Sequence, residues 1–597
     1  MQLFRSRTLI ALVALLALEV PSTVTAQDGR FPRAHFDRQV DDVQRTARPT
    51  DTVRVIIRVT AADAATVAAT LESRDLRIRK FHPSLKAFTL DVTASDLVWL
   101  QSVPGIIAVS SDAAVGSAPL ATAESLSSGS GYQQNQDSGW SQLLTFLTSN
   151  ISASKSNVLR QTLGLTSSDP TGSGVGIAVI DSGIAPVADL VGKVSAFYDF
   201  TNGAGGVAVA PNDRYGHGTH VAGLIAGNGL TSLGKYQGVA PGARLIGLKV
   251  LGDNGEGRTS DVITAVEFAT ANRVALGINI INLSIGHPPY ESAATDPLVQ
   301  AVEAASRAGI IVVVSAGNVG VNAATNTIGY GGILSPANAP SVIAVGAAKT
   351  QGTIDPSDDR VANYSSRGPS WQDGFAKPDV IAPGQLLAAP VVLGSLIATQ
   401  FPSLVVSAAK SYMTLSGTSM AAAVESGLVA VALQAARNAG HGPLTPNTVK
   451  AITEYTALTM RDESGQVYDR MTQGAGRVNG DGVVALAQAA DTSVRTGSYW
   501  LTQAVTPYSV YSGVTVQWGQ QVIWGNNIVW GELLRTNAPA WAANIVWGEN
   551  IVWGENIVWG ENIVWGENIV WGENIVWGEN ILEALRAEFD GTQSDTQ

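Results

Sequence analysis

Three short stretches of this chain carry side chains that could act together on a substrate. Asp181 ends the apolar run Gly176–Asp181, His217 and His220 lie in the segment Tyr215–Gly223, and Ser419 lies in Leu415–Ala423. A serine hydroxyl is a weak nucleophile and needs an adjacent base, which a histidine can supply while a carboxylate holds the imidazole in one tautomer. These residue types therefore suit nucleophilic catalysis by a serine.

Each stretch also has a simpler interpretation. Asp181 could be a turn residue that follows a strand, and Ser419 could be the N-cap of a buried helix. The two histidines could bind a metal, although a pair three residues apart without nearby Cys or acidic ligands is a weak metal signal.

The segments around these residues predict the elements that must position them. The run before Asp181 predicts a buried strand that delivers a carboxylate at its C-terminal end, where parallel α/β sheets collect ligands. Residues 420–436 are rich in Ala, Val and Leu, which predicts a helix with Ser419 at its positive end. Residues 155–490 alternate short apolar strands with helices, so we expect a mostly parallel sheet covered on both faces.

The order Asp181, His217, Ser419, each in its own glycine-rich segment, resembles that of the subtilisin-like serine proteases (subtilases, peptidase family S8). The resemblance implies a subtilisin-like α/β fold, a triad of these three residues with His217 as the base, and no cofactor for catalysis. It also implies that Asn318, at the end of the apolar run 310–318, forms an oxyanion hole with the Ser419 backbone N–H.

Two further segments resemble the substrate-binding parts of the family. Residues 251–257 and 281–286 would form two edges between which an extended peptide adds as a strand. The alternative interpretation is a loop and a buried strand. The residues expected to contact substrate are Gly255, Glu256, Gly257, Leu283, Ser284, Ile285 and Gly286.

The chain departs from the family pattern at three places. Ala423 stands where Pro is usual, and the first turn of a helix tolerates that change. Glu425 stands where an apolar residue is usual, and if buried without a partner it would titrate at high pH. Asp189 resembles a family calcium ligand, but residues 228–237 do not reproduce the usual binding loop, so structural calcium stands beside a solvated surface acid as an alternative.

Length, charge and the N-terminus restrict the class of protein. A chain of 597 residues needs two or more domains, the net charge of −12 comes without a basic cluster for nucleic acid, and zero cysteines exclude disulfides. Residues 1–26 have the charged, apolar and small-residue regions of a signal peptide, with an uncleaved anchor as the alternative. We therefore expect export, to the medium or the cell surface.

Residues 53–112 predict a separate unit with the order β-α-β-β-α-β, which is the ferredoxin-like α+β pattern. By position and element order it resembles the inhibitory propeptide of subtilases (the I9 type), and the alternative is an unrelated α+β module. Residues 113–154 follow as a linker and lead-in. Because residues 116–142 are rich in Ser, Gly, Ala and Gln, we expect maturation cleavage in or near them.

The C-terminal region has a different kind of sequence. After a connector at 491–517, residues 518–581 repeat the unit Trp-Gly-Glu-Asn-Ile-Val, and a tail follows at 582–597. An even period with Gly and Asn in each unit favours short strands over helix, and stacked strands would form a β-solenoid. The repeat could contact the cell envelope or polysaccharide, be structural or anchoring, or be an aggregation-prone tail that its acidic residues keep soluble.

Two functions from different classes fit these observations. The first is a secreted serine endopeptidase made as a self-processing zymogen, which acts on proteins or peptides and is inhibited by its own propeptide. The second is a catalytically silent surface protein that keeps the fold for binding. The presence of Asp181, His217, Asn318 and Ser419 together favours the first. If the chain is active, activity on the acid side should follow His217, whose ordinary pKa is ~6.5.

Overall fold

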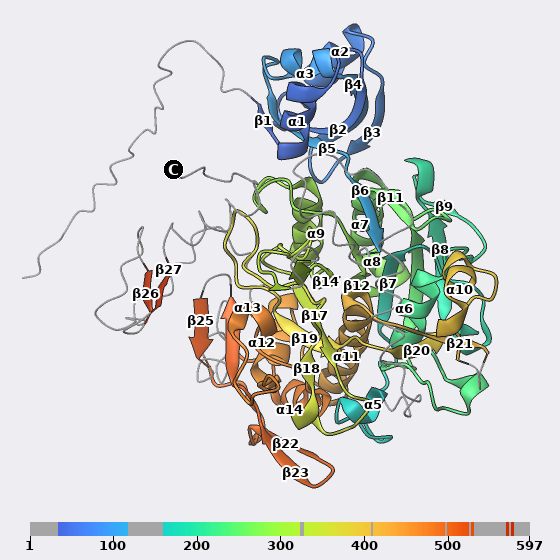
Figure 1. The fold of residues 1–597 in the computed structure, drawn as a ribbon, viewed down its shortest axis with the longest axis vertical. Helices are drawn as coiled ribbons and strands as arrows, with labels where there is room; N and C mark the ends of the chain where they lie inside the picture. Colours follow the sequence, from blue (N-terminus) through green and yellow to red (C-terminus); the bar gives the residue numbers. More distant parts are fainter. Residues whose placement is uncertain are drawn as a thin grey trace, which may run out of the picture.

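The computed structural model describes residues 34–117, residues 159–530 with gaps at 204, 323–326, 407–409, 496–497 and 525–526, and the strand residues 569–571 and 575–577. An N-terminal unit sits on a larger α/β domain (Figure 1). The predicted signal peptide, most of the linker, most of the repeat and the tail lie outside the described residues.

The N-terminal unit is a five-stranded sheet in the order β1-β5-β2-β4-β3, packed on helices. Val55 and Ile57 on β2 face the core of this unit, whereas Ile56 points to the opposite side and joins the core of the large domain. The element order predicted for 53–112 is observed, and the unit also includes β1 and α1, which precede residue 53. The elements are β1 (His35–Phe36), α1 (Arg38–Thr46), β2 (Thr52–Val59), α2 (Ala64–Ser73), β3 (Ile78–His82), β4 (Ala87–Thr93), α3 (Ala94–Leu100) and β5 (Ile106–Ser111).

The large domain is built on a mostly parallel sheet, as the sequence predicts. Its strand order is β18-β17-β14-β12-β7-β10-β8-β9, with β19 also paired to β17, and only β9 and β18 run antiparallel to their neighbours. The central strands are buried on both faces, which explains their nearly continuous apolar sequences. The strands are β7 (Gly176–Asp181), β8 (Val194–Asp199), β9 (Val207–Ala208), β10 (Arg244–Lys249), β12 (Ile278–Leu283), β14 (Ile311–Ser315), β17 (Ile343–Lys349), β18 (Arg360–Val361) and β19 (Val380–Pro383).

Helices cover both faces of this sheet. On one face α7 (Thr259–Ala271) and α9 (Pro297–Arg307) pack between the sheet and the N-terminal unit (Figure 1). On the other face lie α6 (His217–Ala226), α11 (Thr418–Asn438), α12 (Pro446–Thr456) and α14 (Gly480–Ala489). Helix α11 is long and apolar enough to span a membrane, but its burial at the centre of this core accounts for its composition.

The core of the large domain extends beyond Ala490, where the sequence predicts its end. Trp500, Tyr511 and Trp518 are buried in the same cluster as α11 and α14. The hairpin of β22 (Tyr508–Tyr511) and β23 (Val514–Gln517) brings Ser509 to the Trp518 indole, whose Nε1 donates to Ser509 Oγ at 2.9 Å. The described residues of the predicted connector 491–517 therefore belong to the folded domain, and the first tryptophan of the repeat belongs to its core.

The described strands of the repeat form antiparallel hairpins. β24 (Gln521–Trp524) pairs with β25 (Asn527–Trp530), and β26 (Ile569–Trp571) pairs with β27 (Ile575–Trp577). In a parallel β-solenoid each residue would stack on its equivalent in the next unit. Here Trp571 pairs with Ile575 instead, so these strands differ from the predicted arrangement.

Candidate active site

Asp181 and His217 come together where β7 ends and α6 begins. His217 Nδ1 lies 2.8 Å from Asp181 Oδ1 and 3.0 Å from Oδ2. A side chain at Gly218 would collide with the Gly183 carbonyl and come within 3.1 Å of Asp181 Cβ. Glycine at 218 therefore allows the first turn of α6 to approach the end of β7.

The hydrogen bond to Asp181 determines which nitrogen of His217 can act as a base. Because Nδ1 donates to the carboxylate, Nε2 carries the lone pair in the neutral imidazole. Burial alone would lower the pKa of His217. The charge and hydrogen bond of Asp181, with a smaller effect of the charge on Asp213, outweigh burial and raise this pKa above its ordinary value.

His220 has a different role from His217. Its Nε2 lies 3.1 Å from the Leu387 carbonyl and 3.2 Å from the Met413 carbonyl, so it acts as a donor to two backbone oxygens. Burial lowers the pKa of His220 to about 3, which keeps the ring neutral. Within the described ranges, no group of three or more His, Cys, Asp or Glu side chains is placed to hold a metal ion.

Ser419 is the second residue of α11, which packs against α6. Its Oγ donates to the Ser284 carbonyl at 3.0 Å, and Ser284 Oγ donates to the Ser419 carbonyl at 2.9 Å. The structure thus places Ser284, a residue predicted to bind substrate, directly against Ser419. In this state the Ser419 hydroxyl donates to Ser284 and not to His217.

Asn318 lies next to the segment that leads into Ser419. Its side-chain Oδ1 accepts from the backbone N–H and the hydroxyl of Thr418, both at 2.9 Å. The Asn318 amide nitrogen then lies beside Gly417. A Cβ added to Gly417 would be 3.3 Å from this nitrogen. A neutral N–H donor is thus held close to Ser419.

The two predicted substrate edges flank one strand of the chain itself. β6 (Ala114–Ser117) runs antiparallel between β11 (Glu256–Arg258) and β13 (Ile285–Gly286). Gly116 is the residue that pairs on both sides, with Glu256 and with Gly286.

The other predicted substrate-binding residues lie around these edges. Gly257 pairs with Val115, and Arg258, which the sequence analysis did not select, pairs with Ala114. Gly255 precedes β11, where a side chain would collide with the Tyr215 ring. Leu283 ends β12, and its side chain is buried in the core. It therefore anchors the chain just before β13.

The structure accommodates both changes in α11. Helix α11 begins at Thr418, so Ala423 lies in its second turn and not in the first turn, where the sequence analysis placed it; its side chain is buried in the core. Glu425 is fully buried, and neither of its carboxyl oxygens has a hydrogen-bond partner. Burial raises the pKa of Glu425 to about 8, with a small opposing effect of Thr453, as expected for a carboxyl group without a partner.

Asp189 is a buried acid and not a solvated one. It is buried, its Oδ1 accepts from the backbone N–H and hydroxyl of Thr231 at 3.0 Å, and its Oδ2 accepts from the Tyr412 hydroxyl. Calcium requires six to eight oxygen ligands, whereas these neighbours are donors directed at the carboxylate. These donors occupy the Asp189 carboxylate in this structure, and structural calcium at this position stays a prediction.

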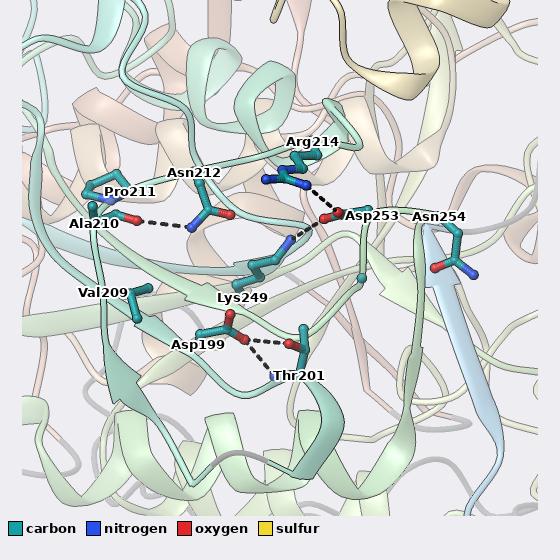
Figure 2. A pocket seen from close by; sticks show the side chains of 11 residues that line it. Asp199, Thr201, Val209, Ala210, Pro211, Asn212, Arg214, Lys249, Asp253 and Asn254 are labelled. Atoms are coloured by element: carbon teal, nitrogen blue, oxygen red, sulfur yellow. Dashed lines mark hydrogen bonds and ion pairs between the residues drawn. The ribbon is translucent and has the colours of Figure 1, made fainter.

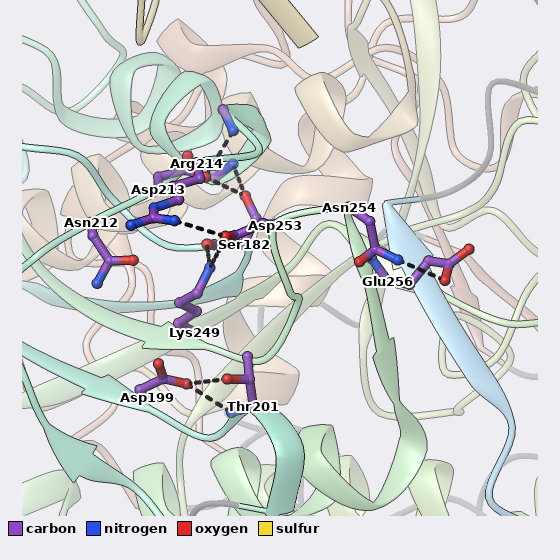
Figure 3. A network of polar contacts seen from close by, with 12 residues as sticks. Ser182, Asp199, Thr201, Asn212, Asp213, Arg214, Lys249, Asp253, Asn254 and Glu256 are labelled. Atoms are coloured by element: carbon purple, nitrogen blue, oxygen red, sulfur yellow. Dashed lines mark hydrogen bonds and ion pairs between the residues drawn. The ribbon is translucent and has the colours of Figure 1, made fainter. Parts of the chain in front are cut away.

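Sequence reasoning missed a polar network beside the Asp181–His217 pair. Figure 3 shows Ser182, Asp213 and Lys249 in this network, where Ser182 Oγ donates to Asp213 Oδ1 at 2.9 Å and Lys249 Nζ donates to the Ser182 carbonyl at 2.6 Å. A single Asp before a glycine-histidine segment is typical of a turn, so the local pattern carries no sign of these contacts.

A cavity of about 800 Å³ adjoins this network. Lys249 extends toward it from β10, and Arg214 and Asp253 form an ion pair of 3.4 Å at its side (Figure 2). Asp199 lies across from them and accepts from Thr201. The cavity is thus lined by opposite charges that largely offset one another.

The chain is similar to one known protein family and to several individual proteases. The Subtilase family (Peptidase_S8) matches residues 172–482, which include the segments of Asp181, His217 and Ser419. The serine protease AprX of Bacillus subtilis (strain 168) is 39% identical over 319 residues, which cover 53% of this chain and 67% of that protein. Subtilisin DY of Bacillus licheniformis is 37% identical over 263 residues, 44% of this chain and 77% of that protein.

A solved structure shares the fold at lower identity. Fervidolysin from Fervidobacterium pennivorans superposes with a TM-score of 0.53 and 22% identity, over 76% of this chain and 63% of that one. At this identity the likeness concerns the fold alone. The family match and the identity to AprX go further: the chain belongs to the subtilase family and is a subtilisin-like serine endopeptidase.

Proposed function

We propose that this protein is a secreted serine endopeptidase, made as a self-processing zymogen, that hydrolyses peptide bonds through an acyl-enzyme formed on Ser419. The observation that carries the proposal is β6, which lies as a strand between β11 and β13 beside Ser284. An extended segment of polypeptide thus occupies the place where a peptide substrate is expected, next to the nucleophile.

In the proposed reaction, the Ser419 hydroxyl turns from the Ser284 carbonyl to His217 Nε2. As Oγ attacks the scissile carbonyl, its proton passes to Nε2, and Asp181 stabilises the resulting imidazolium. The same proton then goes to the amine that leaves when the C–N bond breaks. Water hydrolyses the serine ester by the reverse sequence and restores the enzyme.

The oxyanion that forms during attack needs donors that are fixed in advance. The Asn318 amide nitrogen and the Ser419 backbone N–H are assigned this role. Support comes from the anchoring of Asn318 Oδ1 on Thr418, which leaves the amide N–H groups directed away from that contact. Removal of one such donor lowers kcat by a factor of roughly 10²–10³.

The N-terminal unit is assigned the role of an inhibitory propeptide. Its sheet places Ile56 against the core of the protease domain, and several polar contacts join it to α7. Lys80 Nζ lies 3.3 Å from Asp261, the Ser84 N–H donates to Glu267 at 2.8 Å, and Asp112 accepts from the Ser260 N–H at 2.8 Å. Asp112 therefore caps the N-terminus of α7 from outside the domain.

We assign residues 1–26 as the signal peptide and residues 116–142 as the region of maturation cleavage. The test compares the full precursor with Ser419→Ala and with the exposed control Ser464→Ala by intact mass and casein hydrolysis over time. We expect the wild type and the control to lose their N-terminal unit and digest casein. The Ser419→Ala protein should do neither, and an active Ser419→Ala protein would contradict the proposal. If all three proteins are inert, the catalytically silent binding protein replaces it.

The Trp repeat is assigned an accessory role, contact with the cell envelope or polysaccharide through its aromatic rings. Because Trp518 and Val522 belong to the core of the domain, the truncation that tests this role must end after residue 530. We expect the shortened protein to hydrolyse casein normally and to lose retention on cell-wall polysaccharide. Equal retention of both proteins would contradict the role.

A further inference from the structure

Asp213 is a buried carboxylate placed between the two segments that carry Asp181 and His217. Its Oδ1 accepts from Ser182 Oγ at 2.9 Å and from the Gly216 N–H at 2.8 Å. Its Oδ2 accepts from the Thr219 N–H at 2.9 Å and from the Thr219 hydroxyl at 2.6 Å. Figure 3 shows this carboxylate among its neighbours.

The donors to Asp213 flank the catalytic pair on both sides. Ser182 follows Asp181 in the chain, Gly216 precedes His217, and Thr219 lies one turn into α6. Ser182 Oγ also accepts from the Gly218 N–H at 2.9 Å. One carboxylate therefore ties the end of β7 to the start of α6, and these two ends set the separation of Asp181 and His217.

The four hydrogen bonds to Asp213 favour its ionised form. Burial raises the pKa of this carboxyl group, and the bonds from Thr219 and Gly216 oppose that effect. In the observed arrangement all four partners donate to the carboxylate, which matches its ionised form. A second negative charge thus lies close to His217, where it helps to raise the pKa of the imidazole.

We propose that Asp213 is a positioning residue for the reaction, which fixes the imidazole of His217 against Asp181 and adds its charge to that of Asp181 in stabilising the imidazolium. This inference rests on the proposed function, because it assumes that His217 is the base. Asp213 touches neither the substrate nor the reacting atoms, and its effect passes through His217 and Ser182.

The other groups around the imidazole have distinct effects. Asp181 faces it from β7, and His220 on α6 is neutral because burial lowers its pKa to about 3. Lys249 on β10 ends on the Ser182 carbonyl, and Arg214 pairs with Asp253. The substitution Asp213→Asn removes one charge from this set and leaves the rest in place.

The test is the pH dependence of kcat/KM for Asp213→Asn beside two other variants. We expect kcat to fall about ten- to hundredfold with little change in KM, because a small misplacement of the base is costly. We also expect the acid limb to move to lower pH, since loss of a negative charge lowers the pKa of His217. Ser182→Ala keeps the charge, so it should lower kcat and leave the acid limb in place. Asp199→Asn removes a carboxylate that contacts Thr201 and should change neither quantity.

Other results would overturn the inference. Wild-type kcat/KM in Asp213→Asn, or a loss of rate without movement of the acid limb, would reduce Asp213 to a purely structural group. If Asp213→Asn does not fold, Ser182→Ala decides: unchanged kcat would show that the link between β7 and α6 does not position His217. Full activity of Ser419→Ala would overturn the proposed function itself, which is a separate result from either of these.

Discussion

At the scale of single residues, three buried carboxyl groups of this domain differ in the donors around them. Asp181 accepts from His217 Nδ1 and from the Ser182 N–H at 2.7 Å. Asp213 accepts from four donors, whereas Glu425 has no hydrogen bond of ordinary geometry and only the Thr453 side chain opposes the effect of its burial. Hydrogen-bond donors favour the ionised form, so the four donors to Asp213 oppose the effect of its burial, whereas burial raises the pKa of Glu425 to about 8.

The first prediction concerns the acid limit of activity. Because the pKa of His217 is raised above its ordinary value of 6.5, the imidazole stays protonated and inactive as a base up to a higher pH. We therefore expect the acid limb of kcat/KM to have its midpoint above 6.5, measured with a neutral peptide substrate whose own charge does not change. A midpoint at or below 6.5, or a rate that is flat from pH 5 to 9, would contradict this.

The second prediction concerns Glu425. Its pKa is about 8 in the folded protein against an ordinary value of 4.5, so the free energy of unfolding should fall as pH rises through this window, by about 1.4 kcal/mol per pH unit. Glu425→Gln removes the titration, and its gain in stability should therefore grow from pH 5 to pH 8. Urea unfolding in a Ser419→Ala background, which prevents self-digestion, measures the gain. The exposed Glu463→Gln serves as the control, and a gain that is independent of pH would count against the assignment.

At the scale of elements, β6 connects two strands that do not pair with each other. β11 and β13 are joined only through β6 in their three-stranded sheet, and Val115 on β6 is buried in the core beneath α7. The order of this small sheet therefore depends on four residues of the N-terminal region.

The third prediction tests this dependence. Gly116→Pro removes a backbone N–H and cannot keep the pairing with both neighbours, so the amide hydrogens of β11 and β13 should lose protection together. Hydrogen exchange of the Ser419→Ala precursor with and without Gly116→Pro measures the effect. Val98→Asp, a change at an exposed residue of the N-terminal unit, should leave both strands protected. Continued protection in Gly116→Pro would show that β11 and β13 are ordered without β6.

The fourth prediction concerns the loop that follows α6. Thr231 from this loop and Tyr412 from β21 (Tyr412–Leu415) both donate to Asp189. Asp189→Asn would direct amide hydrogens at these donors, which should cost about 1–3 kcal/mol of stability. Because hydroxyl and backbone donors occupy the Asp189 carboxylate, we expect the same loss of stability in buffer with calcium and in buffer with EDTA. A loss confined to calcium-containing buffer would indicate an ion at Asp189.

At the scale of the whole molecule, the protease domain and the chain after it are one folded body as far as residue 524. Trp500, Tyr511 and Trp518 fill a core that α11 and α14 share. The fifth prediction follows: a chain that ends at residue 490 should aggregate or fail to mature, whereas one that ends at residue 530 should give active enzyme. Soluble yield and casein hydrolysis compare the two, and equal activity would mean that the hairpin of β22 and β23 is dispensable.

The parts of this structure that could be predicted from the sequence are those that local pattern controls. Buried apolar runs located β7 and β14, and the alanine-rich segment located α11, because strand and helix periodicity is a local property. Asp213, the buried Asp189 and the burial of Trp518 depend on contacts between residues far apart in the chain. The Asp213 site, for example, needs Ser182 from one element and Thr219 from another. The spacing of these residues in the sequence does not indicate that they contact the same carboxylate.

The three-stranded sheet of β11, β6 and β13 has one more consequence. While β6 is in place, the hydrogen-bonding groups of both cleft strands are occupied within the same chain. When it leaves, two bare strand edges face each other across a gap that accepts any extended backbone, including a loosened segment of a neighbouring enzyme molecule. Self-digestion of the mature enzyme should then be second order in its concentration, whereas the precursor tolerates crowding. If the protein matures as proposed, the same four residues of β6 also limit how concentrated the mature enzyme can be kept.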